Sequence, residues 1–138
     1  MNLRCVVVDD SSIQRLSIVK LIKEHPSLTL LAEYKNALET KKGLNEVEVD
    51  LIFLDIQLSD GLSFEIFDAV DIKSAVIFTT AYDEYALQAF KLNSIDYLLK
   101  PIDDQDLETA VDKFRNRAPQ KQAVTLDFND IKNLLSNA

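Results

Sequence analysis

The sequence predicts an α/β domain, a doubly wound five-stranded parallel sheet with helices on both of its faces. Five short apolar segments alternate along the chain with segments whose apolar residues recur at helical spacing. The short segments are apolar at nearly every position, which is typical of parallel strands buried on both faces. Parallel strands need right-handed crossover connections, so the intervening helices are expected to cover both faces of the sheet.

The predicted strands are short, rich in apolar residues and bounded by polar residues or by proline. They are residues 3–8, 28–34, 51–54, 75–78 and 95–99. The first strand, LRCVVV, ends at the polar run Asp9-Asp10-Ser11-Ser12, and the third, LIFL, ends at Asp55. Lys100-Pro101 terminates the last strand, because proline cannot donate to the hydrogen-bond ladder of a sheet.

Each predicted helix follows a strand, and most of them open at residues that can cap a first turn. The helices begin near Ser12, Asn36, Ser63, Asp83 and Asp103, and the first four end near His25, Leu44, Val70 and Leu92. In the first helix, Ile13, Leu16 and Val19 form the apolar stripe that is expected to face the sheet. Residues 59–61, Ser-Asp-Gly, form a loop before the third helix.

The composition fits one globular domain, since the 138 residues are 47% hydrophobic and 28% charged. The 23 acidic and 15 basic side chains give a net charge of −8, which disfavours direct nucleic-acid binding by this chain. The single cysteine, Cys5, cannot form an internal disulfide and is expected to be a small core residue. The chain has no signal-peptide pattern and no apolar run of about 20 residues, so we expect a soluble, cytoplasmic protein without a membrane span.

Polar side chains follow four of the predicted strands at the point where each strand ends. They are Asp9 and Asp10, Asp55, Thr80 and Lys100. In a doubly wound sheet, ligands bind outside the carboxyl ends of the strands, so these side chains are expected to share one cleft. Three carboxylates that close raise one another's pKa unless a cation lies among them, and Mg²⁺ with oxygen ligands is the natural candidate.

Asp55 is the best nucleophile candidate, because it ends the central apolar strand and rigid structure holds it on both sides. An aspartate that attacks phosphorus becomes an acyl phosphate, and this transfer needs positioning and neutralised phosphoryl oxygens. Mg²⁺ and Lys100 can supply positive charge, and the Thr80 hydroxyl can donate a hydrogen bond. Taken singly, Asp9-Asp10 can equally be a helix cap, Thr80 a partner of the backbone and Lys100 a surface residue.

Four motifs, VVVDD, LIFLD, FTTA and DYLLKP, occur in this order, each at the end of a predicted strand. On these motifs the chain resembles the receiver domain of two-component response regulators, from about residue 3 to residue 117. The expected sheet then has the flavodoxin-like strand order 2-1-3-4-5. The resemblance implies that Asp55 is the phosphoacceptor and that Asp9 and Asp10 belong to the Mg²⁺ pocket, with Asp10 as a direct ligand.

The same resemblance implies roles for four further groups. The backbone carbonyl of Gln57 would be a metal ligand, Thr80 the phosphate-sensing hydroxyl and Lys100 the phosphate-pairing lysine. Tyr97 matches the aromatic switch residue, although a tyrosine in this strand can also be ordinary half-buried packing. The Lys100-Pro101 peptide bond matches a position that is usually cis in the family.

The segment after the phosphoacceptor, DIQLSDG, lacks the proline usual in the family and brings Gly61 closer to Asp55. Together with FTTAYDEYALQAFKLNSIDYLLKPI, it is similar to the LytR/AgrA-like receivers that precede LytTR-type DNA-binding domains. This implies a transcription regulator in which a sensor histidine kinase phosphorylates Asp55. The fourth helix, last strand and final helix would then form a surface that dimerises or contacts the output domain. The receiver would catalyse its own phosphorylation and dephosphorylation without being a turnover enzyme.

Two other functions fit part of the pattern. A Mg²⁺-dependent phosphohydrolase of the haloacid-dehalogenase type carries a second acid two residues after its nucleophile, and Gln57 occupies that position here. A receiver-like docking module that is never phosphorylated would not need the intact set of acidic, hydroxyl and lysine residues. The complete set therefore favours the phosphoacceptor hypothesis over both.

Residues 119–138 lie beyond the predicted receiver domain of residues 1–118. Residues 119–123 have the composition of a linker, and an amphipathic helix is expected after them. Its apolar residues are Phe128, Ile131, Leu134 and Leu135. We expect the start of a connector helix to an output domain absent from this chain. The alternative is a terminal helix that folds back on its own domain or on a neighbouring copy.

Overall fold

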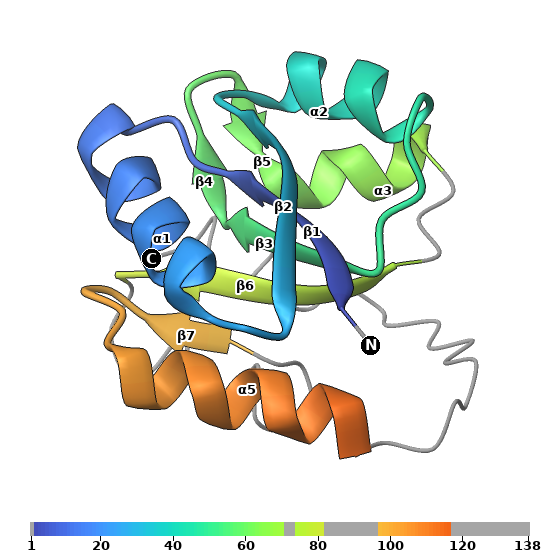
Figure 1. The fold of residues 1–138 in the computed structure, drawn as a ribbon. Helices are drawn as coiled ribbons and strands as arrows, with labels where there is room; N and C mark the ends of the chain where they lie inside the picture. The colour runs from blue at the N-terminus through green and yellow to red at the C-terminus, as the bar shows by residue number, and fades with distance from the viewer. Residues whose placement is uncertain (1, 71–73, 82–96, 117–138) are drawn as a thin grey trace.

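The computed structural model describes residues 2–70, 74–81 and 97–116, which form a layered α/β fold (Figure 1). The central sheet has the order β2-β1-β3-β6-β7, and all neighbouring strands in it are parallel. Its strands are β1 (Leu3–Val8), β2 (Leu28–Tyr34), β3 (Leu51–Asp55), β6 (Ala75–Thr80) and β7 (Tyr97–Leu99). The predicted parallel sheet and its order 2-1-3-4-5 are confirmed, because β6 and β7 are the fourth and fifth strands of this sheet.

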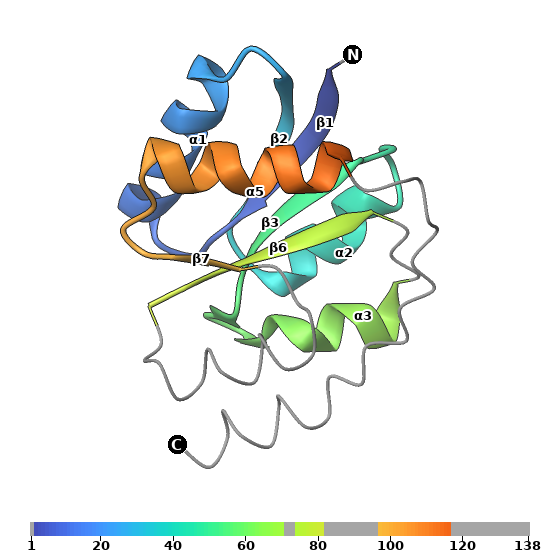
Figure 2. The same cartoon turned by 90° about the horizontal axis from the view of Figure 1, so that it is seen from below.

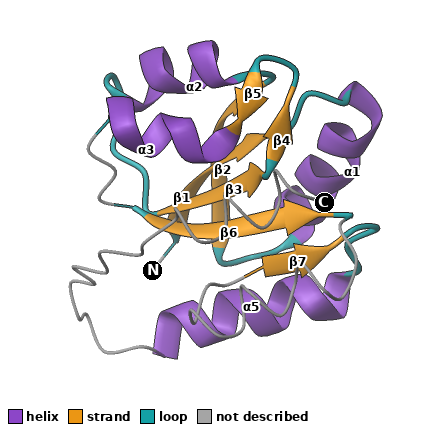
Figure 3. Cartoon of the chain, turned by 180° about the vertical axis from the view of Figure 1, so that it is seen from behind, coloured by secondary structure: helices purple, strands orange, loops and turns teal. Residues whose placement is uncertain are grey.

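Helices cover both faces of the sheet, as Figures 2 and 3 show. They are α1 (Ser12–Glu24), α2 (Ala37–Leu44), α3 (Ile66–Ala69), which follows the 3₁₀ turn η1 (Ser63–Glu65), and α5 (Asp104–Asn116). Successive strand residues point to opposite faces, so the core has two halves. Val8 and Leu54 pack on the side of α2 and α3, whereas Val7 and Phe53 pack on the side of α1 and α5.

The first helix turns a different face to the sheet from the one predicted. Ile18, Val19 and Ile22 are its buried residues, whereas Ile13 and Leu16 are 80% and 67% exposed. At about 100° per residue, Ile13 and Leu16 lie on the side of the helix opposite to the buried set. The prediction that these two residues face the sheet is therefore wrong, because α1 carries two apolar stripes and only one of them can pack on the sheet.

The predicted loop after β3 contains a small hairpin. Strands β4 (Gln57–Leu58) and β5 (Gly61–Leu62) pair antiparallel, and a two-residue tip, Ser59-Asp60, joins them. Gly61 has φ 132°, a conformation that side chains disfavour, which explains why a glycine ends this tight turn. The short length and mixed composition of these strands gave no periodic signal, so the sequence predicted only a loop.

Other predictions are confirmed or lie outside the described residues. Cys5 is fully buried in β1, and burial raises the pKa of its thiol to about 12, as fits a core residue. The helix expected at residues 83–92 and the terminal helix expected within residues 119–138 lie outside the described part of the chain. Among the described helices, none has the length and apolar character required to cross a bilayer.

Candidate functional site

The carboxyl ends of the strands surround a pocket of about 580 Å³. Its lining residues are Asp10, Asp55, Gln57, Leu58, Ser59, Thr80, Ala81 and Lys100. β3 and β6 end at Asp55 and Thr80, Lys100 directly follows β7, and the β4–β5 hairpin contributes one wall. Because parallel strands end at the same edge of the sheet, residues far apart in the sequence meet here.

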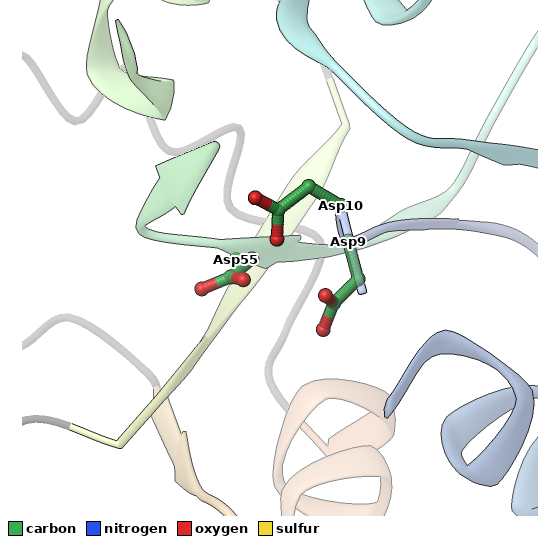
Figure 4. Close-up of side chains that lie close together, drawn as sticks. All are labelled: Asp9, Asp10 and Asp55. Carbon is green, nitrogen blue, oxygen red and sulfur yellow. The ribbon is translucent and has the colours of Figure 1, made fainter. Parts of the chain in front are cut away.

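Three of the predicted residues form an acidic cluster at this edge, with oxygen atoms of Asp9, Asp10 and Asp55 within 4.8 Å of one another (Figure 4). Asp9 is fully buried, Asp55 is 8% exposed and Asp10 is exposed. Closely spaced carboxylate oxygens are the ligands that a hard divalent cation such as Mg²⁺ prefers. Asp10 and Asp55 line the pocket, whereas Asp9 is not among its lining residues.

Lys100 is the cation of this site and lies between two of its carboxylates. Its Nζ is 2.9 Å from Asp9 Oδ2 and 3.0 Å from Asp55 Oδ2. A third contact, a 2.6 Å hydrogen bond, goes to Oε1 of Gln14 on α1. The Lys100–Pro101 peptide bond is cis, as the resemblance implied. Sequence reasoning missed Gln14; its place in the first turn after the acidic pair was the available signal.

The helix cap considered as an alternative for the acidic pair is Ser11 in the structure, whereas Asp9 supports the turn that precedes α1. Its Oδ1 accepts a 2.9 Å hydrogen bond from the backbone N–H of Ser11, at the start of α1. Its backbone carbonyl accepts a 2.7 Å bond from Arg15 Nη1, and Arg15 Nε is 3.2 Å from Oε1 of Glu33 on β2. Arg15 therefore anchors the β1–α1 connection that carries the acidic pair, a supporting role that no motif indicated.

The electrostatics of the site follow from burial and from the excess of carboxylates. Burial raises the pKa of Asp55 to about 6; Lys100 acts in the opposite direction, and Asp9 and Asp10 add to the increase. Burial lowers the pKa of Lys100, but its hydrogen bonds and charge interactions with Asp9 and Asp55 outweigh this, so the net shift is upward. The structure therefore favours the charged form of Lys100, whereas burial disfavours the ionised form of Asp55.

Thr80 and Tyr97 lie on neighbouring strands near the pocket. Thr80 is buried and lines the pocket. Tyr97 is half-buried, pairs in register with Phe78 of β6, and packs against the core on the side of α2 and α3. Tyr97 is not among the residues that line the pocket.

The chain matches known proteins in sequence and in fold. The family model of the response regulator receiver domain matches residues 5–112. The sensory transduction protein LytT of Enterococcus faecalis is 35% identical over 111 residues, which are 78% of this chain and 46% of that protein. The transcriptional regulatory protein LytR of Staphylococcus aureus is 33% identical over 133 residues, 94% of this chain and 54% of that protein.

Solved receiver structures share the fold. The signal receiver domain of the response regulator NarL from Mycobacterium tuberculosis superimposes with a TM-score of 0.70 at 20% identity and covers 84% of this chain and 98% of its own. The chain spans about half the length of the curated relatives it matches. Since the receiver model matches most of the residues, the chain belongs to the response regulator receiver family of two-component systems and is related to LytT and LytR.

Proposed function

We propose that the chain is a phosphoacceptor switch in which Asp55 receives a phosphoryl group from a phosphohistidine of a sensor histidine kinase. The observation that carries this proposal is the pair formed by Lys100 Nζ and Asp55 Oδ2, 3.0 Å apart in a pocket with two further carboxylates close by. A nucleophile, a fixed cation and room for a phosphoryl group thus occur together. Phosphoryl transfer depends mainly on this kind of positioning and charge neutralisation.

In the proposed step, a carboxylate oxygen of Asp55 attacks phosphorus and the P–N bond to the histidine breaks. The electron pair of that bond stays on the imidazole nitrogen, and Asp55 becomes an acyl phosphate. Lys100 can pair with the negative charge of the transferred group, because its ammonium already lies beside the carboxylate of Asp55, the attacking nucleophile. The receiver catalyses this transfer and the later hydrolysis on itself, so it is not an enzyme that turns over an outside substrate.

The acidic cluster fits Mg²⁺. Within the described part of the chain, the cluster holds three carboxylates and its ion pairs come from one lysine, Lys100, which contacts Asp9 and Asp55, so negative charge remains that a divalent cation would neutralise. We propose Asp10, Asp55 and the backbone carbonyl of Gln57 as protein ligands, with Asp9 beneath them. When bound, the ion supplies positive charge for the phosphoryl oxygens. Asp9 also keeps Lys100 and the start of α1 in place.

The proposed response to phosphorylation is a shift of Thr80 toward the phosphoryl group and a change in Tyr97, which would alter the surface around β7 and α5. Leu99 of β7 is an exposed apolar residue on that surface. We propose that this surface mediates dimerisation or contact with an output domain. By analogy with LytT and LytR, this would be a LytTR-type DNA-binding domain that regulates transcription. The proposed receiver comprises residues 1–118, and residues 119–138 begin the connector.

The proposed kinase partner explains the unexpected face of α1. Ile13 and Leu16 are exposed apolar side chains on the helix that starts two residues after Asp10. A protein donor must dock beside the acidic pocket to deliver its phosphoryl group, and an apolar pair next to that pocket suits such a contact. We place this encounter in the cytoplasm; with a net charge of −8, the chain itself is not the part expected to touch DNA.

Intact mass spectrometry after incubation with Mg²⁺ and acetyl phosphate tests the proposal. We expect the parent chain to gain one phosphoryl group that is labile to base, and Asp55→Asn to gain none. Asp50→Asn, at the other end of β3, is the matched control and should be phosphorylated like the parent. A parent chain that gains nothing under conditions that modify another receiver would contradict the proposal and favour a docking module.

A further inference from the structure

The β4–β5 hairpin forms the wall of the pocket that faces the acidic cluster from the α2 side. Gln57, Leu58 and Ser59 line the pocket, and the tip of the hairpin continues into Asp60 and Gly61. Only two residue pairs, Gln57 with Leu62 and Leu58 with Gly61, hold the two strands together. So short a ladder is marginal by itself, and the position of this wall must depend on contacts with the rest of the domain.

Asp60 makes such a contact, although it is outside the pocket lining. Its Oδ1 accepts a 2.9 Å hydrogen bond from the backbone N–H of Ala37, and its Oδ2 accepts a 3.2 Å bond from that of Leu38. These are first-turn amides of α2, which the helix itself leaves without partners. The bonds to Ala37 and Leu38 lower the pKa of Asp60, so the carboxylate is ionised at neutral pH.

Helix α2 already has a cap from its own segment. Asn36 Oδ1 accepts a 2.8 Å hydrogen bond from the backbone N–H of Glu39. The contact with Asp60 is therefore a second cap, which joins the helix to a hairpin more than twenty residues away. α2 is a firm anchor for the hairpin, because Ala37 and Thr40 are buried and Thr40 Oγ1 bonds to the carbonyl of Asn36 at 2.8 Å.

We propose that Asp60 is a positioning residue of the phosphoacceptor pocket: by holding the hairpin tip on the amino end of α2, it fixes the Gln57–Ser59 backbone for cation binding. This inference rests on the proposed function. It assigns to Asp60 a task distinct from capping, since the cap from Asn36 would persist without it. Leu58, which is buried, holds the middle of the hairpin, whereas Asp60 holds its tip.

The test is the affinity of the unphosphorylated chain for Mg²⁺, measured by calorimetry with the parent and three variants. Asp60→Ala should weaken binding about tenfold, the lower end of what loss of a supporting contact around a metal site costs. Asp60→Asn keeps an oxygen acceptor for one of the two amides and should lose less. Asn36→Ala removes the cap within α2 but leaves the hairpin contact intact, so its affinity should stay within about twofold of the parent.

The controls distinguish a failure of the positioning role of Asp60 from a failure of the proposed function. If Asp60→Ala binds Mg²⁺ like the parent, or if Asn36→Ala loses as much affinity, the positioning role is wrong while the proposed function stands. If the parent itself does not bind Mg²⁺, the proposed function fails and this inference fails with it. Should Asp60→Ala not fold, Asp60→Asn decides: affinity equal to that of the parent contradicts the proposal, and reduced affinity beside an unaffected Asn36→Ala supports it.

Discussion

Aspartates lie at both ends of strand β3, and their pKa values are shifted in opposite directions. Asp50, just before the strand, lies in the fork of Arg4: its Oδ2 accepts from Arg4 Nε at 3.1 Å and its Oδ1 from Nη2 at 3.2 Å. The hydrogen bonds from Arg4 lower the pKa of Asp50. At the other end, burial raises the pKa of Asp55 to about 6 although Lys100 is only 3.0 Å away.

The difference lies in how the positive charge is shared. Arg4 pairs with Asp50 through two parallel bonds at an edge open to solvent, where Glu48 is its other partner. Lys100 is a point charge divided among Asp9, Asp55 and the side-chain oxygen of Gln14. The amino end of the strand carries a satisfied ion pair, whereas the carboxyl end keeps unbalanced negative charge that a divalent cation can neutralise.

Removing the cation at each end should give the largest contrast. We expect Lys100→Met to slow phosphorylation by acetyl phosphate about 100-fold, because it removes the donor that stabilises charge on the transferred group. Arg4→Met should leave the rate within about twofold of the parent, since Arg4 lies on β1 beside the start of β3 and does not line the pocket. The rates are read by intact mass spectrometry. Equal losses in the two variants would mean that Lys100 acts only through stability.

Neutralising the aspartates should change the free energy of unfolding in opposite directions. A pKa raised from 3.8 to about 6 means that ionised Asp55 opposes folding above about pH 6, and that this penalty is absent below about pH 4. Asp55→Asn should therefore stabilise the metal-free chain at pH 7.5, by about 2 kcal/mol, and the gain should shrink as the pH falls.

Asp50→Asn should destabilise the chain at pH 7.5, by about 1 kcal/mol, because the ion pair with Arg4 is partly exposed and screened. Since the pKa of Asp50 is lowered in the folded chain, this loss of stability should shrink at acidic pH, where Asp50 is protonated in both the folded and the unfolded state. Urea unfolding in EDTA measures both variants. A destabilised Asp55→Asn would show that its bond to Lys100 outweighs burial.

The exposed apolar side chains of α1, Ile13 and Leu16, should affect the rate of phosphoryl transfer only when the donor is a protein. Replacing Ile13 and Leu16 together with serine should slow transfer from a phosphorylated histidine kinase about tenfold, because the variant loses the free energy gained by burying two exposed apolar side chains on docking. Transfer from acetyl phosphate should be unchanged. Leu38→Ser, which alters an exposed leucine of α2, is the control. A loss with both donors would instead place the defect in the pocket.

The smallest expected effect is the pH dependence of Mg²⁺ affinity. As the pH falls through about 6, Asp55 becomes protonated and ceases to be a good ligand. Between pH 7.5 and pH 5.5 the ionised fraction, and with it the affinity, should fall about fourfold. Asp50→Asn should follow the same curve, because Asp50 is far from the cluster. A flat curve would mean that the bound ion draws on Asp9 and Asp10 without Asp55.

Much of the site could be read from the chain because its parts are strand ends. Asp55 ends an apolar run, and Asp9 and Lys100 directly follow two others, so recognising parallel strands predicts that the three will meet. Gln14 and Arg15 could not be found in this way. They lie on a helix whose rotation about its own axis decides which side chains reach the pocket, and the apolar pattern of α1 was compatible with two rotations.

The sequence by itself determined the strands of the central parallel sheet and the carboxylates and lysine at its edge, because buried parallel strands are apolar throughout and end abruptly at polar residues. Only the tertiary structure decided which stripe of α1 is buried, that Lys100 is shared with Gln14, and that Asp60 ties the hairpin to α2. These three features depend on contacts between segments far apart in the chain, which local periodicity does not reveal. Such contacts form only when the packed core fixes each element in place.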